Sequence, residues 1–133
     1  MYILVIDAQG GGVGRQVVAS AKQSVPDAVI MAVGTNSAAT AAMRKAGADS
    51  AATGENAVVV ACRKADVIVG PVGIVIADAL YGEITPKMAV AIGQSRAQRI
   101  LIPINHCDNI VVGVPELALG QLIQEAVARI RAQ

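Results

Sequence analysis

The chain alternates short, mainly apolar runs with longer segments that are apolar on one helical face. Continuous apolar runs are typical of strands buried on both faces. They predict strands at residues 2–6, 28–33, 49–52, 66–69 and 99–104. Helical periodicity, with hydroxyl, proline and glycine end signals, predicts helices at residues 13–24, 38–46, 55–64, 86–97 and 115–132. Residues 74–80 fit either a helix or a strand, and residues 110–114 predict a short edge strand.

This order of elements predicts an α/β fold. Alternating strands and helices imply right-handed crossovers and a parallel sheet. We therefore expect residues 1–133 to form one Rossmann-like, doubly wound domain, with about five strands and helices on both faces of the sheet. In such sheets ligands bind beyond the carboxyl ends of the strands, where the strand order reverses.

Composition adds an expectation about assembly. Hydrophobic residues make up 54% of the chain and charged residues 16%, against roughly 45–50% and 25% in ordinary globular proteins. Aromatic residues make up only 2%, so the apolar mass is mostly Ala, Val and Ile. A small monomer buries that much apolar surface with difficulty, which predicts a homo-oligomer. The alternative is a well-filled core under an alanine-rich surface.

Charge and cysteine content exclude several classes of protein. The net charge is +1 without a basic block, so nucleic acid is not an expected partner. No apolar run is long enough to span a membrane, and residues 1–7 lack the basic start of a signal peptide. Cys62 and Cys107 suit a reducing compartment, which predicts a cytoplasmic protein. One histidine and two distant cysteines do not form a metal-ligand set.

The most informative motif follows the first predicted strand. Glycines between a buried strand and a helix allow backbone amides to approach a phosphate at the helix N-terminus. The glycines in question are Gly10, Gly11, Gly12 and Gly14. They predict a cradle for an anionic, phosphate-bearing ligand, and the alternative is a tight turn that needs glycine only for packing.

Two known phosphate-binding templates fit this loop incompletely. The dinucleotide fingerprint requires a third small residue at position 15, where this chain has Arg15. The P-loop requires Lys followed by Ser or Thr after the glycines, and here Arg15 and Gln16 stand there. Triphosphate hydrolysis by the P-loop route is therefore not expected.

The end of the second predicted strand bears on the choice of nucleotide. Enzymes that bind NAD carry an acidic residue there for the ribose hydroxyls, but this chain has Thr35, Asn36 and Ser37. Such groups can donate to a phosphate, which favours NADP over NAD, or they can cap the following helix. Gly70 and Gly73 would allow the chain to pass close beneath a cofactor.

Candidate catalytic residues are few. Asp7 at the tip of the first strand could act on a ligand or bind loop amides. His106 is a candidate general acid or base. Residues 82–87 could form a lid that brings Glu83 and Lys87 over the pocket, or carry ordinary solvated charges. No paired carboxylates or Ser-His-Asp order stands out.

Three runs together resemble a known family. Residues 6–14, 34–40 and 82–88 are similar to those of a family of small bacterial proteins named domain of unknown function 3842, and the similarity covers nearly the whole chain. The family pattern has Gly where this chain has Ala8, which leaves the glycine cradle intact. The resemblance implies no particular activity.

We therefore expect a nucleotide- or dinucleotide-binding protein, with NADP the favoured ligand. One alternative is a non-catalytic sensor or assembly protein that forms an oligomer. Another is a small transferase or hydrolase that acts on a phosphorylated metabolite through Asp7 or His106.

Overall fold

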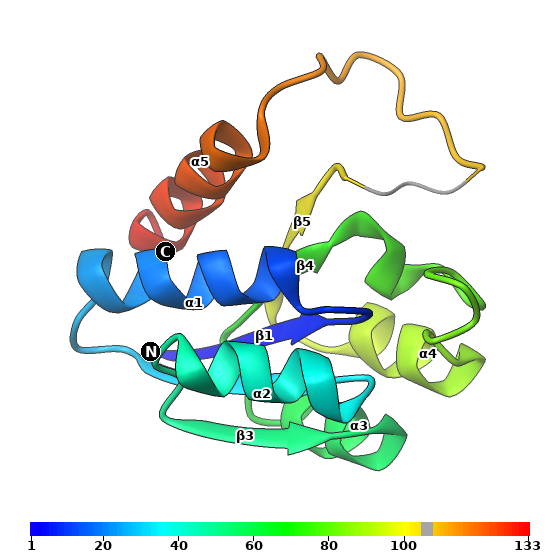
Figure 1. Ribbon diagram of the computed structural model, residues 1–133, viewed down its shortest axis with the longest axis horizontal. Coiled ribbons are helices and arrows are strands. Elements are labelled where there is room, and N and C mark those ends of the chain that lie inside the picture. Colours follow the sequence, from blue (N-terminus) through cyan, green and yellow to red (C-terminus); the bar gives the residue numbers. More distant parts are fainter. Residues whose placement is uncertain (105–107) are drawn as a thin grey trace.

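A computed structural model describes residues 1–104 and 108–133, and the described chain contains a five-stranded, wholly parallel sheet (Figure 1). The strand order is β3-β2-β1-β4-β5. The strands are β1 (Tyr2–Asp7), β2 (Val29–Gly34), β3 (Ser50–Thr53), β4 (Val67–Pro71) and β5 (Gln98–Ile102). The predicted fold class is confirmed, and every strand predicted in the first 104 residues is present to within two residues at each end.

Helices cover both faces of this sheet. The helices are α1 (Gly12–Ser24), α2 (Ser37–Lys45), α3 (Glu55–Cys62), α4 (Pro86–Gln94) and α5 (Leu119–Arg131), with a 3₁₀ turn η1 (Val72–Val75). Alternate residues of β1 point to opposite faces, so Ile3 and Val5 pack under α1, α2 and α5, whereas Leu4 and Ile6 pack under α3 and α4. The core is thus two apolar layers separated by the sheet.

The strand order reverses beside β1. The chain runs from β1 to β2 and β3 on one side, then crosses to β4 and β5 on the other. Ile3, Leu4 and Val5 of β1 pair with β4, and all six residues of β1 pair with β2. The carboxyl ends of β1 and β4 therefore flank the position where parallel sheets of this kind bind ligands.

The segment between β5 and α5 departs from the prediction. Residues 110–114 are not a strand, and α5 begins at Leu119 instead of residue 115. Ile110 and Val112 are both 91% exposed, and Gly113 has a φ of 82°. The β-propensity of these residues is real, but the segment runs out from the body (Figure 1), away from the edge strand with which it would have to pair.

Residues 74–80, ambiguous in sequence, end η1 and continue as turns. Their local hydrogen bonds join Ile76 to Gly73 and Ala79 to Ile76.

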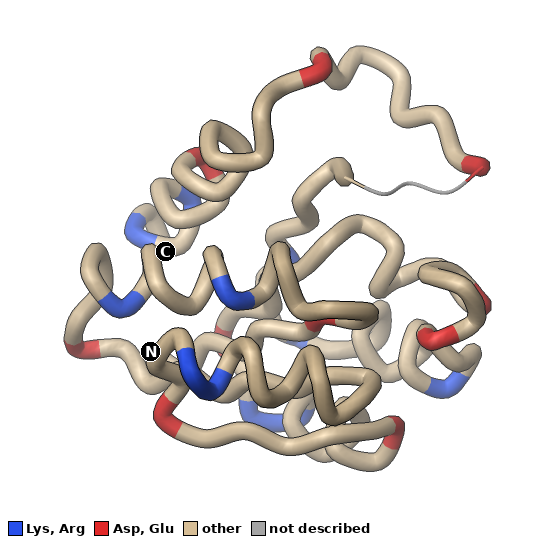
Figure 2. Tube along the Cα trace, viewed as in Figure 1, with Lys and Arg blue, Asp and Glu red and all other residues tan. Residues whose placement is uncertain are grey.

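Among the described residues, no helix is long and apolar enough to cross a membrane. Figure 2 shows Lys and Arg interspersed with Asp and Glu over helices and loops, without a block of one sign.

Two glycines of α1 differ sharply in their surroundings and allow a matched test. A Cβ at Gly14 would lie 2.8 Å from Cβ of Asp7 and 2.5 Å from Sδ of Met43, whereas a Cβ at Gly12 would meet nothing within 4 Å. We expect Gly14→Ala to lower the free energy of unfolding by about 1–3 kcal/mol through overpacking. Gly12→Ala should be neutral or stabilising by up to ~1 kcal/mol. Urea denaturation of both variants measures the difference, and equal effects would contradict the packing role of Gly14.

Candidate functional site

The glycine-rich loop is held in shape by Asp7, the last residue of β1. Oδ1 of Asp7 accepts the Ala8 amide at 2.8 Å, and Oδ2 accepts the Gly14 amide at 2.7 Å. The side chain is 4% exposed. Both carboxyl oxygens of Asp7 therefore bind loop amides, which is one of the two roles considered from the sequence. Because these oxygens are occupied, the carboxyl is poorly placed to act on a ligand.

The electrostatics of Asp7 reflect this burial. Loss of solvent raises the pKa of the Asp7 carboxyl above its ordinary value, and the nearby charge of Glu83 raises it further. The hydrogen bonds from the Gly14 and Ala8 amides act in the opposite direction without cancelling the effect of burial. Two carboxyl groups thus flank the same loop.

The four glycines of the loop are of two kinds. Gly11 has a φ of 73°, and a Cβ there would lie 2.9 Å from the backbone of Ala39. Gly11 and Gly14 are therefore required by the turn and by the close approach of α1 to its neighbours. Gly10 and Gly12 face open space, since a Cβ at either would meet nothing within 4 Å. Packing within the chain does not explain these two glycines.

Gly10 and Gly12 line a pocket of about 400 Å³ at the switch point of the sheet. The lining residues are Asp7, Ala8, Gln9, Gly10, Gly12, Val13, Arg15, Gln16, Pro71, Leu80, Ile104 and Leu119. Within the described chain, the amides of Gly10 and Gly12 have no hydrogen-bond partner. Arg15 is exposed beside them. The pocket therefore has amide donors and a cation at one side, and an apolar wall formed by Leu80, Ile104 and Leu119.

A second cluster is centred on Glu83 and contacts the loop at Gln9. Its Oε1 accepts hydrogen bonds from Oγ1 of Thr35 at 2.6 Å, from Nδ2 of Asn36 at 2.8 Å and from the Gln9 amide at 2.9 Å. Burial tends to raise the pKa of Glu83, but these three hydrogen bonds outweigh it and lower the pKa below its ordinary value. The donors predicted to receive an anionic ligand are thus occupied by a carboxylate of the chain itself.

Asn36 also has the alternative role expected from sequence. Its Oδ1 accepts the Ala39 amide at 2.9 Å and caps α2, while its Nδ2 also donates to the Gln9 carbonyl at 2.9 Å. Ser37, the first residue of α2, is exposed. Of the three predicted residues, two therefore join the Glu83 cluster, and none lines the pocket.

Other predicted site residues lie elsewhere. A Cβ at Gly70 would be 2.5 Å from the Ile6 carbonyl oxygen, and one at Gly73 would be 3.2 Å from Leu80, so both glycines serve packing. Lys87 lies on α4 and lines a different groove. His106 is outside the described residues, as are Asn105 and Cys107.

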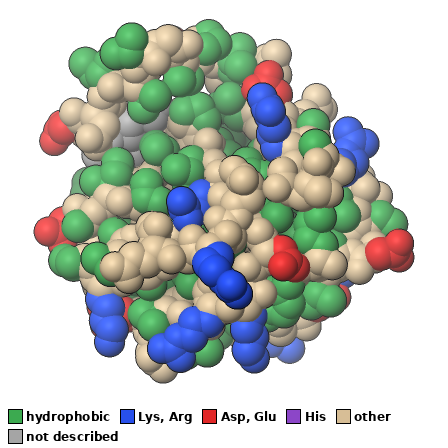
Figure 3. Space-filling model, turned by 180° about the vertical axis from the view of Figure 1, so that it is seen from behind, with side chains coloured by type: hydrophobic (Ala, Val, Ile, Leu, Met, Phe, Trp, Pro, Cys, Tyr) green, Lys and Arg blue, Asp and Glu red, His purple; other side chains and the backbone are tan. Residues whose placement is uncertain are grey.

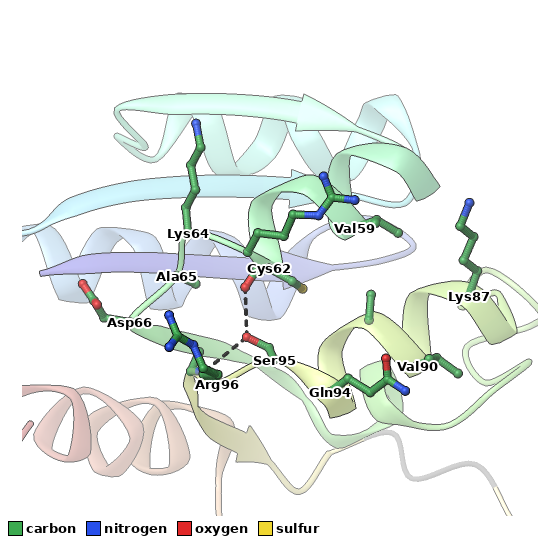
Figure 4. Close-up of a pocket in the computed structure, with 13 residues that line it drawn as sticks. Val59, Cys62, Lys64, Ala65, Asp66, Lys87, Val90, Gln94, Ser95 and Arg96 are labelled. Atoms are coloured by element: carbon green, nitrogen blue, oxygen red, sulfur yellow. Dashed lines mark hydrogen bonds between the residues drawn. The ribbon is translucent and has the colours of Figure 1, made fainter.

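The groove that Lys87 lines is the larger cavity, about 800 Å³ between α3 and α4 (Figure 4). Two of its polar side chains are bonded within the chain: Oγ of Ser95 donates to the Cys62 carbonyl and accepts the Ala97 amide, and Oδ2 of Asp66 accepts the Tyr2 amide. Burial raises the pKa of the Cys62 thiol to about 11, which makes it a poor nucleophile. Figure 4 shows Lys64 and Lys87 well apart, at opposite ends of the groove. We therefore place the candidate site at the glycine loop, despite its smaller volume.

Comparisons with known proteins agree with this fold. The model of a family described as Domain of unknown function (DUF3842) matches residues 2–133. The chain belongs to this family. Its fold is similar to that of a dodecameric FMN-dependent UbiX-like decarboxylase from Escherichia coli O157:H7, with a TM-score of 0.50 and 16% sequence identity over 98% of this chain and 76% of that chain. No curated protein matches the sequence significantly.

In this member of the family, the sequence placed Glu83 only in a possible lid at residues 82–87, without its bonds to Gln9, Thr35 and Asn36. It also did not point to Arg15 as a lining residue of the pocket. Arg15 directly follows the glycines, at the position of the P-loop lysine, and that position was the available signal. No local pattern in the sequence indicates the bonds of Glu83, because Glu83 is 74 residues from Gln9 and 48 from Thr35. Among the described residues, no group of His, Cys, Asp and Glu could hold a metal ion.

The role of Asp7 in the loop can be tested by Asp7→Asn. An asparagine offers one acceptor oxygen and turns an NH₂ group toward the other amide, so either Ala8 or Gly14 loses its partner. We expect a loss of about 1–3 kcal/mol in the free energy of unfolding. Asp108→Asn, at an exposed position, is the control and should change it by less than ~0.5 kcal/mol. Equal denaturation midpoints for the two variants would contradict the assigned role.

Proposed function

We propose that the pocket at the glycine loop binds the phosphate group of a mononucleotide-type ligand, with FMN as the first candidate. The observation that carries this proposal is the pair of amides at Gly10 and Gly12, which have no hydrogen-bond partner in the described chain and belong to residues that line the pocket with Arg15 and have open space at their Cβ positions. Glycine in the first turn of a helix lowers helix stability. Nothing in the packing of the chain requires it at position 12, and close approach of a phosphate would.

The phosphate end of the pocket has three favourable contributions. The amides of Gly10 and Gly12 can donate hydrogen bonds, the N-terminus of α1 carries a partial positive charge, and Arg15 provides a full one. Asp7 holds the Gly14 amide and therefore sets the path of the loop but adds no donor. This arrangement suits one phosphate group.

The other side of the pocket is apolar and suits a ring system. Leu80, Ile104 and Leu119 come from three separate segments and converge on it. The similar fold of an FMN-dependent decarboxylase supports FMN as the probe to test first. A flavin, when bound, supplies hydride or electron-transfer chemistry. In this chain the pocket residues would bind and orient it and exclude water from its ring.

NADP ranks second because of the Glu83 cluster. The phosphate predicted to bind Thr35 and Asn36 would have to displace a carboxylate that already accepts both donors. A dinucleotide also carries two phosphates in its bridge, while the amides of Ala8 and Gly14 are committed to Asp7. NADP and NAD therefore belong in the same titration, with NADP the tighter of the two if either binds.

Titration of FMN, followed by flavin fluorescence, tests the ligand. FMN should bind more tightly than riboflavin, which lacks the phosphate, by about tenfold or more, since charge-assisted hydrogen bonds contribute ~1.5–3 kcal/mol each. Gly12→Val, which blocks approach to the amides, and Arg15→Gln should each abolish this preference.

Gly93→Val is the matched control, because Gly93 is also a helical glycine whose Cβ would meet nothing within 4 Å. It should bind FMN like the wild type. Binding of riboflavin and FMN with equal affinity would overturn the phosphate assignment. Failure of FMN, NADP and inorganic phosphate alike to bind would overturn the proposed function.

Assembly is a second candidate function, supported by the segment between β5 and α5. We call residues 108–118 the arm. Ile110 and Val112 on the arm are 91% exposed, and Figure 3 shows hydrophobic side chains over this overhanging segment. Exposed apolar side chains on an extended segment favour contact with a second copy of the chain. The decarboxylase of similar fold is dodecameric.

Light scattering tests assembly. We expect an oligomer of at least two chains at micromolar concentration. The double variant Ile110→Ser/Val112→Ser should shift the mass toward the 13.5 kDa of one chain. Val90→Ser, on an exposed valine of α4, should leave the mass unchanged. A wild-type chain that is monomeric would contradict the expected homo-oligomer.

A further inference from the structure

The Glu83 carboxylate joins three segments that are distant in sequence. Its partners Thr35 and Asn36 follow β2, its partner Gln9 follows β1, and Glu83 itself lies between η1 and α4. All three donors meet the same oxygen, Oε1. One side chain therefore fixes residues 78–83, which we call the 78–83 loop, to the ends of two core strands.

The segments that Glu83 joins are also the strained ones. In the described chain, the non-glycine residues with positive φ are Gln9 (53°), Asp78 (66°), Leu80 (56°) and Tyr81 (59°). All four lie in the glycine-rich loop or in the 78–83 loop. Non-glycine residues adopt this conformation at a cost in free energy, and they keep it where surrounding contacts determine it. The bond from the Gln9 amide to Glu83 is such a contact on one side, and within the 78–83 loop the amides of Gly82 and Glu83 donate to the carbonyls of Asp78 and Leu80.

The 78–83 loop in turn forms a wall of the pocket. Leu80 is 3% exposed and lines the pocket together with Gly10 and Gly12. Gln9, whose amide binds Glu83, lines the pocket from the glycine side. Tyr81 is adjacent to Leu80 but is 96% exposed. Leu80 packs in the core with Ile84, and the bridge that Glu83 makes connects the segment that carries Leu80 to the segment that carries Gly10.

We propose that Glu83 is a latch, a positioning residue that holds the 78–83 loop against the glycine-rich loop and so keeps Leu80 in place as a wall of the ligand pocket. When the latch is broken, the strained loop relaxes outward. The ring end of a ligand then loses a wall, while the phosphate end keeps the Gly10 and Gly12 amides. This second consequence rests on the proposed function, but the first does not.

Limited proteolysis of the ligand-free protein tests the latch directly. Chymotrypsin prefers aromatic residues, and the aromatic residues of this chain are Tyr2 and Tyr81. Cleavage after Tyr81 reports opening of the 78–83 loop. We expect Glu83→Ala to accelerate it by about tenfold or more, because cleavage follows the population of the locally open form. Glu83→Gln, which keeps an acceptor oxygen without the charge, should fall between Glu83→Ala and the wild type.

Glu125→Ala on the exposed face of α5 is the matched control and should be cleaved like the wild type. Thr35→Val removes one donor and should accelerate cleavage less than Glu83→Ala. If circular dichroism shows that Glu83→Ala is unfolded, the cleavage rates of Glu83→Gln and Thr35→Val test the latch instead. Cleavage after Tyr81 at wild-type rates in the folded Glu83 variants would overturn the latch.

The ligand arm of the experiment separates the latch from the proposed function. With FMN, Glu83→Ala should raise the dissociation rate about tenfold, and the FMN-over-riboflavin preference should remain, because the phosphate contacts are intact. A wild type that binds no FMN overturns the proposed function, while the proteolysis still decides the latch. Faster cleavage with unchanged FMN dissociation would show that the 78–83 loop is latched but is not the wall of the pocket.

Discussion

The site depends on the hydrogen bonds between the Asp7 carboxyl and the amides of Ala8 and Gly14. They turn the chain at the end of β1 and start α1 at Gly12, only five residues after the strand. The same contact requires glycine at position 14, because a Cβ there would collide with Asp7 and Met43. Burial of this carboxyl at the tip of a central strand is unfavourable by itself. The two amide bonds offset that cost and determine which amides of the loop remain free.

Two carboxyl groups of the chain divide the loop between them. Asp7 accepts the Ala8 and Gly14 amides and Glu83 accepts the Gln9 amide, while the Gly11 amide donates to the Ala8 carbonyl. What remains is the pair at Gly10 and Gly12 with Arg15 beside it. A loop whose amides were all free could surround a diphosphate. This one is suited to a single phosphate, and that difference separates it from both sequence templates that it partly matches.

The fold was predictable because its signals are local, and the site was predictable only in part. Continuous apolar runs identify β1, β2 and β4, and glycines directly after β1 identify the loop. Residues 110–114 show where local signals fail, since β-branched residues form a strand only when a neighbouring strand offers hydrogen bonds. Glu83 shows the same limit for function. Thr35 and Asn36 were interpreted as donors for an anionic ligand, but in the structure both donate to a carboxylate of the chain itself, 47 residues or more away.

The proposed assembly and the proposed ligand binding would involve the same stretch of chain, so the two candidate functions are compatible. Ile104, just beyond β5, and Leu119, the first residue of α5, both line the pocket. The arm lies between them and exposes Ile110 and Val112 (Figure 1). A contact that orders the arm against a second copy would also restrict where Ile104 and Leu119 can move. Because the apolar wall combines Leu80 of the 78–83 loop with these two residues, Glu83 would then restrain one part of that wall and the neighbouring chain the other.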